Sequence, residues 1–197
     1  MEERKSRKGL YIFLVILLIV LCTAGFFGYK YLSANIDMFS KELYSYDDRY
    51  TMSVPYSWKA SSGASPYAVM AAENKDNSMY AMVSVYKDIT GNGLTVEEYI
   101  YGYINQIAEN SDNPLVQVMS IPPTQGQLGE NVGYYFELDS MSDGLAIHLW
   151  DFVYVADGGY VHVNVASSGE KIATSADIAK GIIASVKSND YNAQAPA

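Results

Sequence analysis

Two histidines, His148 and His162, supply all the imidazole chemistry available to this chain of 197 residues. They fall on two consecutive runs of β-branched and aromatic residues that are separated by the turn sequence at 157–159. This arrangement predicts a hairpin in which His162 pairs near Val155, about seven residues from His148. At ~3.3 Å per residue the rings would lie roughly 23 Å apart, too far to share one metal ion. We therefore expect both to be structural or surface histidines.

Other catalytic arrangements are missing from the sequence. It contains no Gly-x-Ser-x-Gly, His-Glu-x-x-His or Cys-x-x-Cys motif and no phosphate-binding glycine loop. Asp151 lies three residues from His148, and residues at that spacing on a strand face opposite sides. The one cysteine, Cys22, lies in an apolar N-terminal segment, so the rest of the chain has no thiol. We predict no catalytic residue, no metal ligand, no cofactor and no enzymatic activity.

Several aspartates could in principle bind calcium. Asp139, Asp143 and Asp157 lie near predicted strand ends, and Asp47 and Asp48 precede the first predicted strand. Their spacing matches no calcium-binding loop, so we interpret them as solvated loop charges.

Tyrosine is the most distinctive residue type, with 18 copies. Tyr99 and Tyr103 lie on one face of a predicted helix, and Tyr101 points elsewhere. An exposed tyrosine cluster could dock a protein or a glycan; alternatively, tyrosine fills half-buried sheet positions. Trp58 and Trp150 are expected in the core.

The N-terminal segment predicts a membrane anchor. Residues 10–29 carry no charge, and at ~1.5 Å per residue a helix of this length spans the roughly 30 Å of a bilayer core. Four basic residues precede it, which places residues 1–9 in the cytoplasm and the rest of the chain outside the cytoplasm. Residues 30–48 are interpreted as a spacer, and residues 189–197 as a flexible tail.

Two alternatives compete with an uncleaved anchor. A signal peptide has a shorter apolar stretch that ends in a small-x-small site, and residues 23–25 are weakly compatible with one. The apolar run continues past that point through Phe26, Phe27 and Tyr29, which favours the anchor. Cys22 stands where a lipidated cysteine could occur, but the preceding Leu21 is larger than the residue that bacterial lipidation signals have there.

Charge separates the two parts of the chain. Up to Lys30 there are five basic and two acidic residues; beyond it there are eight basic and twenty acidic. An acidic domain repels phosphate backbones, so nucleic acid is not expected as a partner.

The predicted extracytoplasmic domain, residues 49–188, alternates between strand and helix patterns. Residues 50–54, 67–72 and 79–87 predict three strands, and a helix follows with Thr95 and Glu98 as a capping box. Four strand patterns at 115–121, 132–138, 145–156 and 160–166 precede a last helix that begins near Ser175. Its predicted apolar face contains Ile178, Ile182, Ile183 and Val186, and Gly181 is expected to allow close packing on the sheet. Short connections predict an antiparallel sheet with a helix on each face, an α+β fold.

The chain also resembles the Mog/PsbP-like superfamily. The residues that carry the resemblance are YTMSVPYSW at 50–58, VEEYIYGYINQI at 96–107, GYYFEL at 133–138, YVADGGYVHVNV at 154–165 and IAKGIIASVK at 178–187. The resemblance implies an α/β/α sandwich used for binding and assembly, without a common catalytic set. We therefore predict a non-catalytic, single-pass protein of the bacterial cell envelope that binds another envelope protein. A small-ligand or glycan-binding domain is the alternative.

Overall fold

The computed structural model describes residues 39–63, 65–76, 78–87, 94–109, 118–156 and 158–189. The chain divides into two compact units, Met1–Phe39 and Ser40–Ala197, and every described strand and helix belongs to the second unit. The predicted membrane anchor at 10–29 lies outside the described residues. Within the described part of the chain, no helix has the length and apolar character needed to cross a bilayer.

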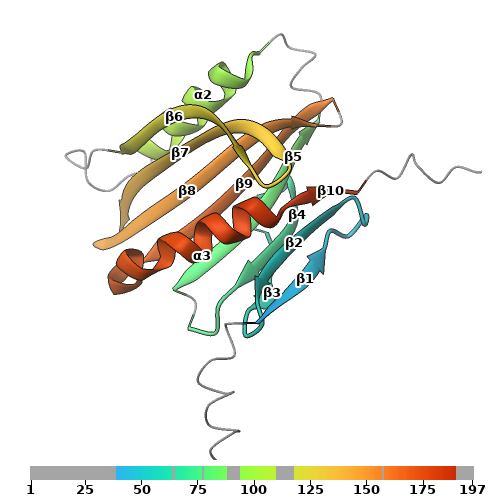
Figure 1. The fold of residues 1–197 in the computed structure, drawn as a ribbon. Helices are drawn as coiled ribbons and strands as arrows, with labels where there is room; N and C mark the ends of the chain where they lie inside the picture. Colours follow the sequence, from blue (N-terminus) through green and yellow to red (C-terminus); the bar gives the residue numbers. More distant parts are fainter. Residues whose placement is uncertain are drawn as a thin grey trace, which may run out of the picture. The chain divides into compact units, whose positions relative to one another are not determined.

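A seven-stranded antiparallel sheet forms the centre of this unit, with the strand order β3-β4-β5-β9-β8-β7-β6 (Figure 1). Consecutive strands pair through short connections, as predicted from the sequence, whereas β5 pairs with β9 across a long intervening segment. Their bounds are β3 Lys59–Ala60, β4 Ala68–Glu73, β5 Met79–Lys87, β6 Met119–Leu128, β7 Asn131–Ser142, β8 Leu145–Ala156 and β9 Gly159–Ser168.

A second, three-stranded antiparallel sheet has the order β1-β2-β10, with β1 at Ser40–Tyr44, β2 at Tyr50–Pro55 and β10 at Lys187–Ser188. Strand β1 lies inside the segment predicted as a spacer, so the folded unit begins earlier than residue 49. The sequence of β1 is mostly polar, and its side chains alternate between exposed and half-buried, so its hydrophobic pattern was weak.

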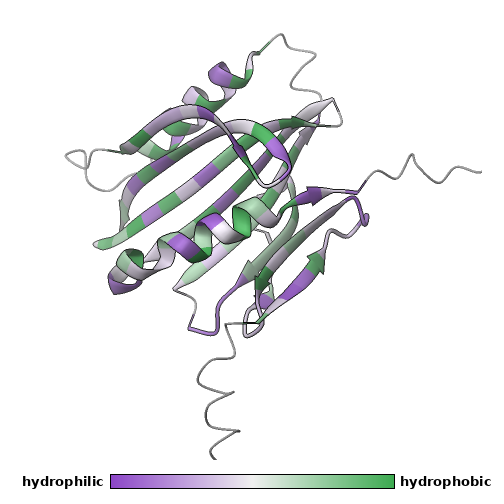
Figure 2. Cartoon of the chain, in the orientation of Figure 1, coloured by the Kyte–Doolittle hydropathy of each residue, from purple (hydrophilic) through white to green (hydrophobic). Residues whose placement is uncertain are grey.

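The helices α2, Val96–Glu109, and α3, Ile172–Ser185, pack on opposite faces of the large sheet. Strand β8 shows this directly: Trp150 and Phe152 belong to the core shared with α3 and the small sheet, whereas Leu149 and Val153 belong to the core beneath α2. Figure 2 shows the corresponding changes of hydropathy along the strands. Trp150 is buried, as is Trp58, which confirms their prediction as core residues.

Helix α2 begins where the capping box predicted. The backbone N–H of Glu98 donates to Thr95 Oγ1 at 3.2 Å, and the backbone N–H of Thr95 donates to Glu98 Oε2 at 2.7 Å. Ile100 and Ile104 are buried against the sheet, whereas Tyr101 is half exposed. The apolar face of α2 is therefore the face that it buries.

Helix α3 differs from its prediction. It begins at Ile172, after the short 3-10 helix Gly169–Lys171, so Ser175 lies inside it and its buried hydroxyl lies 3.1 Å from Ser167 Oγ. Ile178 is 38% exposed, and Ala179 is buried instead. A Cβ on Gly181 would meet nothing within 4 Å, so the predicted close approach to the sheet is wrong.

Strand β6 runs through Pro122 and Pro123, beyond residue 121, where the predicted strand ends. It is an edge strand, so a missing backbone N–H can face its open side, and its register against β7 shifts on both sides of Ile121. Proline therefore makes this strand irregular without ending it.

Candidate functional site

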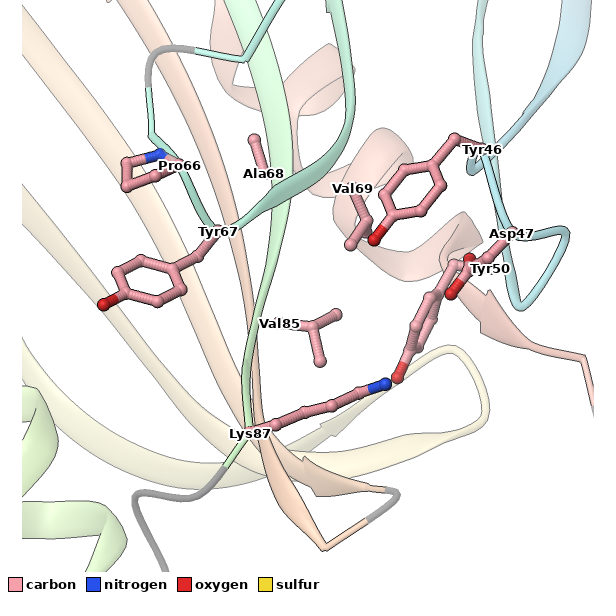
Figure 3. A pocket seen from close by; sticks show the side chains of 9 residues that line it. All are labelled: Tyr46, Asp47, Tyr50, Pro66, Tyr67, Ala68, Val69, Val85 and Lys87. Atoms are coloured by element: carbon pink, nitrogen blue, oxygen red, sulfur yellow. The ribbon is translucent and has the colours of Figure 1, made fainter.

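A pocket opens where the turn between β1 and β2 faces the ends of β4 and β5 (Figure 3). Its volume is about 350 Å³. The lining residues come from three separate stretches of the chain: Tyr46, Asp47, Tyr50, Pro66, Tyr67, Ala68, Val69, Val85 and Lys87. The pocket therefore exists only when the small sheet packs on the large one.

Hydrogen bonds fix the turn that carries Tyr46 and Asp47. Ser45 and Tyr50 close it: the Ser45 N–H donates to the Tyr50 carbonyl at 2.9 Å, and the Tyr50 N–H donates to Ser45 Oγ at 3.0 Å. Asp48 adopts a left-handed φ of 56°, and Asn189 Nδ2 donates to its carbonyl at 2.8 Å. The residue after β10 thus holds the turn against the body of the unit.

The rings of the pocket differ in exposure. Tyr50 is only 1% exposed, whereas Tyr46 is 82% and Tyr67 is 53% exposed. The Tyr67 ring packs on the Tyr86 ring, with the ring centroids 4.7 Å apart. The pocket thus has one buried aromatic wall and two tyrosines at its rim.

The two charged groups of the pocket are not equivalent. Asp47 accepts hydrogen bonds from Ser45 Oγ at 2.7 Å and from the Arg49 N–H at 3.3 Å, and Arg49 Nε lies 3.7 Å from its other oxygen. Partial burial alone would raise the pKa of Asp47, but these hydrogen bonds and the Arg49 charge outweigh it and lower the pKa. Lys87 is exposed and forms no ion pair with any described residue. Its side chain extends toward the Tyr50 hydroxyl (Figure 3).

The two histidines do not line this pocket. His148 lies between two carboxylates, with Nδ1 2.6 Å from Asp139 Oδ1 and Nε2 3.0 Å from Glu137 Oε2. Glu137 also accepts from the Tyr135 hydroxyl and lies 3.7 Å from Lys180 Nζ. The Glu137 carboxylate therefore links His148 and Tyr135 on the sheet to Lys180 on α3.

His162 belongs to a polar cluster beneath α2. Asp151, 0% exposed, accepts at the same oxygen from His162 Nε2 and from Asn164 Nδ2, each at 2.7 Å. On the other side of the ring, the Tyr99 hydroxyl lies 3.2 Å from His162 Nδ1. Since Tyr99 is on α2 and the other three are on β8 and β9, this cluster ties the helix to the sheet.

The two histidines face opposite sides of the sheet. His148 packs on Trp150 in the core beneath α3, whereas His162 packs on Tyr103 beneath α2. The hairpin register pairs His162 with Val153, so the predicted pairing near Val155 is wrong by two residues. The rings do not come together, and neither do His148 and Asp151. Among the described residues no group of three His, Cys, Asp or Glu side chains could hold a metal ion.

Three half-buried tyrosines predict alkaline sensitivity. Burial raises the pKa of Tyr99, Tyr103 and Tyr135 well above the ordinary value, and nearby carboxylates raise it further. Below pH ~10 these phenols are neutral in the folded and the unfolded chain alike, so their contribution to stability is fully present. Above pH ~10 they ionise only in the unfolded chain, so the free energy of unfolding should fall as the pH rises.

Ultraviolet absorbance of phenolate, recorded together with tryptophan fluorescence along a pH titration, measures this loss. We expect part of the phenolate absorbance to appear only at the pH at which tryptophan fluorescence reports unfolding. Ionisation of all the tyrosines near pH ~10 in a chain that is still fully folded would contradict this prediction.

Sequence reasoning did not identify the pocket. Tyr50 and Tyr67 were interpreted only as strand residues, and Asp47 only as a loop charge. The turn sequence Asp143-Gly144 could have revealed one histidine site, because a two-residue turn there pairs His148 directly with Asp139. No comparable local sequence pattern indicates that Tyr46, Tyr67 and Lys87 line one pocket.

Comparisons with known proteins identify the fold. No protein-family model matches the chain, and a search of curated proteins found no match. The solution structure of PsbP from the cyanobacterium Synechocystis is 14% identical, with a TM-score of 0.51 that covers 76% of this chain and 92% of that one. The Ran-binding protein Mog1p of Saccharomyces cerevisiae is 8% identical, with a TM-score of 0.52 that covers 78% of this chain and 97% of that one.

A point mutant of Mog1 superposes similarly, with a TM-score of 0.53 and 9% identity over 80% of this chain and all of that one. Identities this low establish the fold alone. The chain therefore has the fold shared by PsbP and Mog1, which confirms the resemblance predicted from the sequence.

Proposed function

We propose that this chain is a non-catalytic, membrane-anchored protein of the bacterial cell envelope, and that its folded unit binds another protein. The tyrosine-lined pocket formed by Tyr46, Tyr50 and Tyr67 is the centre of the binding surface. The observation that carries the proposal is a concave site with strongly exposed tyrosines at its rim.

Exposed aromatic side chains also occur along the β1–β2 hairpin. Tyr44 and Tyr56 are each more than half exposed; Tyr44 ends β1 just before the turn that carries Tyr46, whereas Tyr56 follows Pro55 at the opposite end of the hairpin. Tyrosine offers a large, rigid apolar surface with a hydroxyl that can bond a partner, and it is enriched among residues that dominate binding energy. Exposed rings around a pocket are therefore expected at a protein-binding site.

Two further observations support the proposal. One solved protein with this fold is named as a Ran-binding protein, so the fold can serve protein recognition. The basic N-terminus and the uncharged segment at 10–29 support a membrane anchor with the folded unit outside the cytoplasm.

A double variant tests the proposal. Full-length chains with an affinity tag are crosslinked in membranes and purified, and the co-purified proteins are quantified. We expect Tyr46→Ser with Tyr67→Ser to reduce recovery of the partner at least about tenfold, since each tyrosine at such a site contributes roughly 2 kcal/mol. Tyr101→Ser, at a 51% exposed tyrosine on α2, is the matched control and should change nothing. Equal recovery from all three chains would contradict the proposed site.

A small ligand or glycan is the second candidate for this pocket. Its volume of about 350 Å³ is large enough for a small molecule, and its rings could stack on a sugar. A thermal-shift screen of metabolites and oligosaccharides distinguishes this function. A compound that stabilises the wild type but not the double variant would favour it over protein binding.

A further inference from the structure

We propose that the pocket is selective for an apolar group that ends in a carboxylate, with Lys87 as the residue that binds the negative charge. This inference rests on the proposed function, because it names the chemistry that the same pocket recognises. The two can nevertheless fail separately, since protein binding through the rim tyrosines does not require a carboxylate.

Apolar side chains form one part of the pocket lining. Pro66, Ala68, Val69 and Val85 line it together with the buried ring of Tyr50. Burying an apolar group against these side chains is favourable because it removes the group from water. The volume of about 350 Å³ suits one aromatic ring or one branched aliphatic group.

The polar end of the pocket carries the Lys87 ammonium and the Asp47 carboxylate. Asp47 is already engaged by Ser45 and Arg49, and the lowered pKa of Asp47 reflects this. The Lys87 ammonium has no such partner within the described residues, although the whole chain has a net charge of −9. An unpaired cation at an apolar pocket is complementary to an anion. A single ammonium balances a single negative charge, which favours a carboxylate over a doubly charged phosphate.

One tyrosine hydroxyl accompanies that ammonium in the pocket. The Lys87 side chain extends toward the Tyr50 hydroxyl, and Tyr46 lines the same pocket (Figure 3). A carboxylate accepts hydrogen bonds and cannot donate them, so it suits an ammonium with a phenol nearby. An ammonium-bearing ligand of the same shape would be repelled by Lys87.

Three probes with the same ring test the head-group preference: phenylacetate, 2-phenylethanol and phenethylammonium. Each is titrated into the full-length chain in detergent micelles and followed by saturation-transfer NMR. Since Lys87 is exposed, we expect a moderate preference, with phenylacetate binding about fivefold more tightly than the alcohol at low salt. The amine should bind more weakly than the alcohol.

Lysine variants test whether Lys87 causes the preference for the acid over the alcohol. Lys87→Gln should abolish the difference between acid and alcohol, and Lys87→Arg should retain it. Lys75→Gln is the matched control, because Lys75 is exposed, unpaired among the described residues, and lies just beyond the other end of β5, roughly 26 Å away. Equal affinities for acid and alcohol, or a preference that survives Lys87→Gln, would overturn the inference.

Two peptides identify the source of the carboxylate: an acetylated Gly-Gly-Phe with a free C-terminus, and its amide. Binding of the peptide acid but not the amide points to the C-terminus of a partner protein, and binding of phenylacetate alone points to a free small acid. Either result supports the carboxylate chemistry. If crosslinked partner recovery still depends on Tyr46 and Tyr67 while no carboxylate preference is found, only this inference fails and the proposed function stands.

Discussion

Asp151→Ala is expected to lower the free energy of unfolding by about 3 kcal/mol, because it removes the acceptor that two buried donors share. Asp151 is 0% exposed and accepts from His162 and Asn164. Without it, both donors are left buried without an acceptor, and the hydrogen bond between Tyr99 and His162 loses its support. Urea denaturation of the full-length chain measures the change. Tryptophan fluorescence is a suitable signal, since Trp58 and Trp150 are the only tryptophans and both are buried.

Asp139→Ala is the matched control, because Asp139 also accepts from a histidine but its side chain is 42% exposed. Its loss should cost less than about 1 kcal/mol. Replacing Asp151, His162 and Asn164 together by valine should recover much of the loss, because these buried polar groups are then removed together with their partners. Equal effects of the two aspartate variants would show that burial does not set the cost.

Gly129→Ala should destabilise the chain by about 3 kcal/mol, because the new methyl group meets both a steric and a conformational barrier. Gly129 has a φ of +61°, and its Cβ would lie 2.0 Å from the carbonyl oxygen of Ala184, near the end of α3. The turn between β6 and β7 would have to move away from the helix. The bond from Asn131 Nδ2 to the Val186 carbonyl, 2.8 Å long, would weaken with it.

Gly144→Ala separates the two causes. Gly144 has a similar φ of +74°, but its Cβ would meet nothing within 4 Å. This variant should therefore show the conformational cost alone, about 1 kcal/mol. A Gly129→Ala chain no less stable than Gly144→Ala would contradict the close contact with α3.

Local patterns were sufficient for most of the fold. The helix α2 has a capping box and an apolar stripe, and β8 has the long β-branched and aromatic run of a buried strand, so both were predicted within a few residues of their bounds. Strand β1 lacks such a pattern, since only Lys41 and Leu43 among its five residues are even half-buried. Its position depends on pairing with β2, which is not encoded within β1 itself.

The site was harder to predict than the fold because it depends on register and on packing between sheets. The partners of His148 and His162 follow from which residue faces which across two hairpins, and a shift of one residue would move every side chain to the other face. The pocket depends on a still less local feature. Tyr46, Tyr67 and Lys87 meet only because the small sheet packs on the large one, and no periodicity in the sequence records that contact.

Site-specific photo-crosslinking examines protein recognition at the pocket without disturbing the rest of the surface. A photoreactive p-benzoylphenylalanine replaces Tyr46 at the rim of the pocket or, as the control, Tyr101 on α2, in the full-length chain in living cells. Both positions are exposed, so both can reach a bound protein. We expect a discrete crosslinked protein from position 46 and none from position 101. The same product from both positions, or a product from position 101 alone, would contradict recognition through the tyrosine-lined pocket.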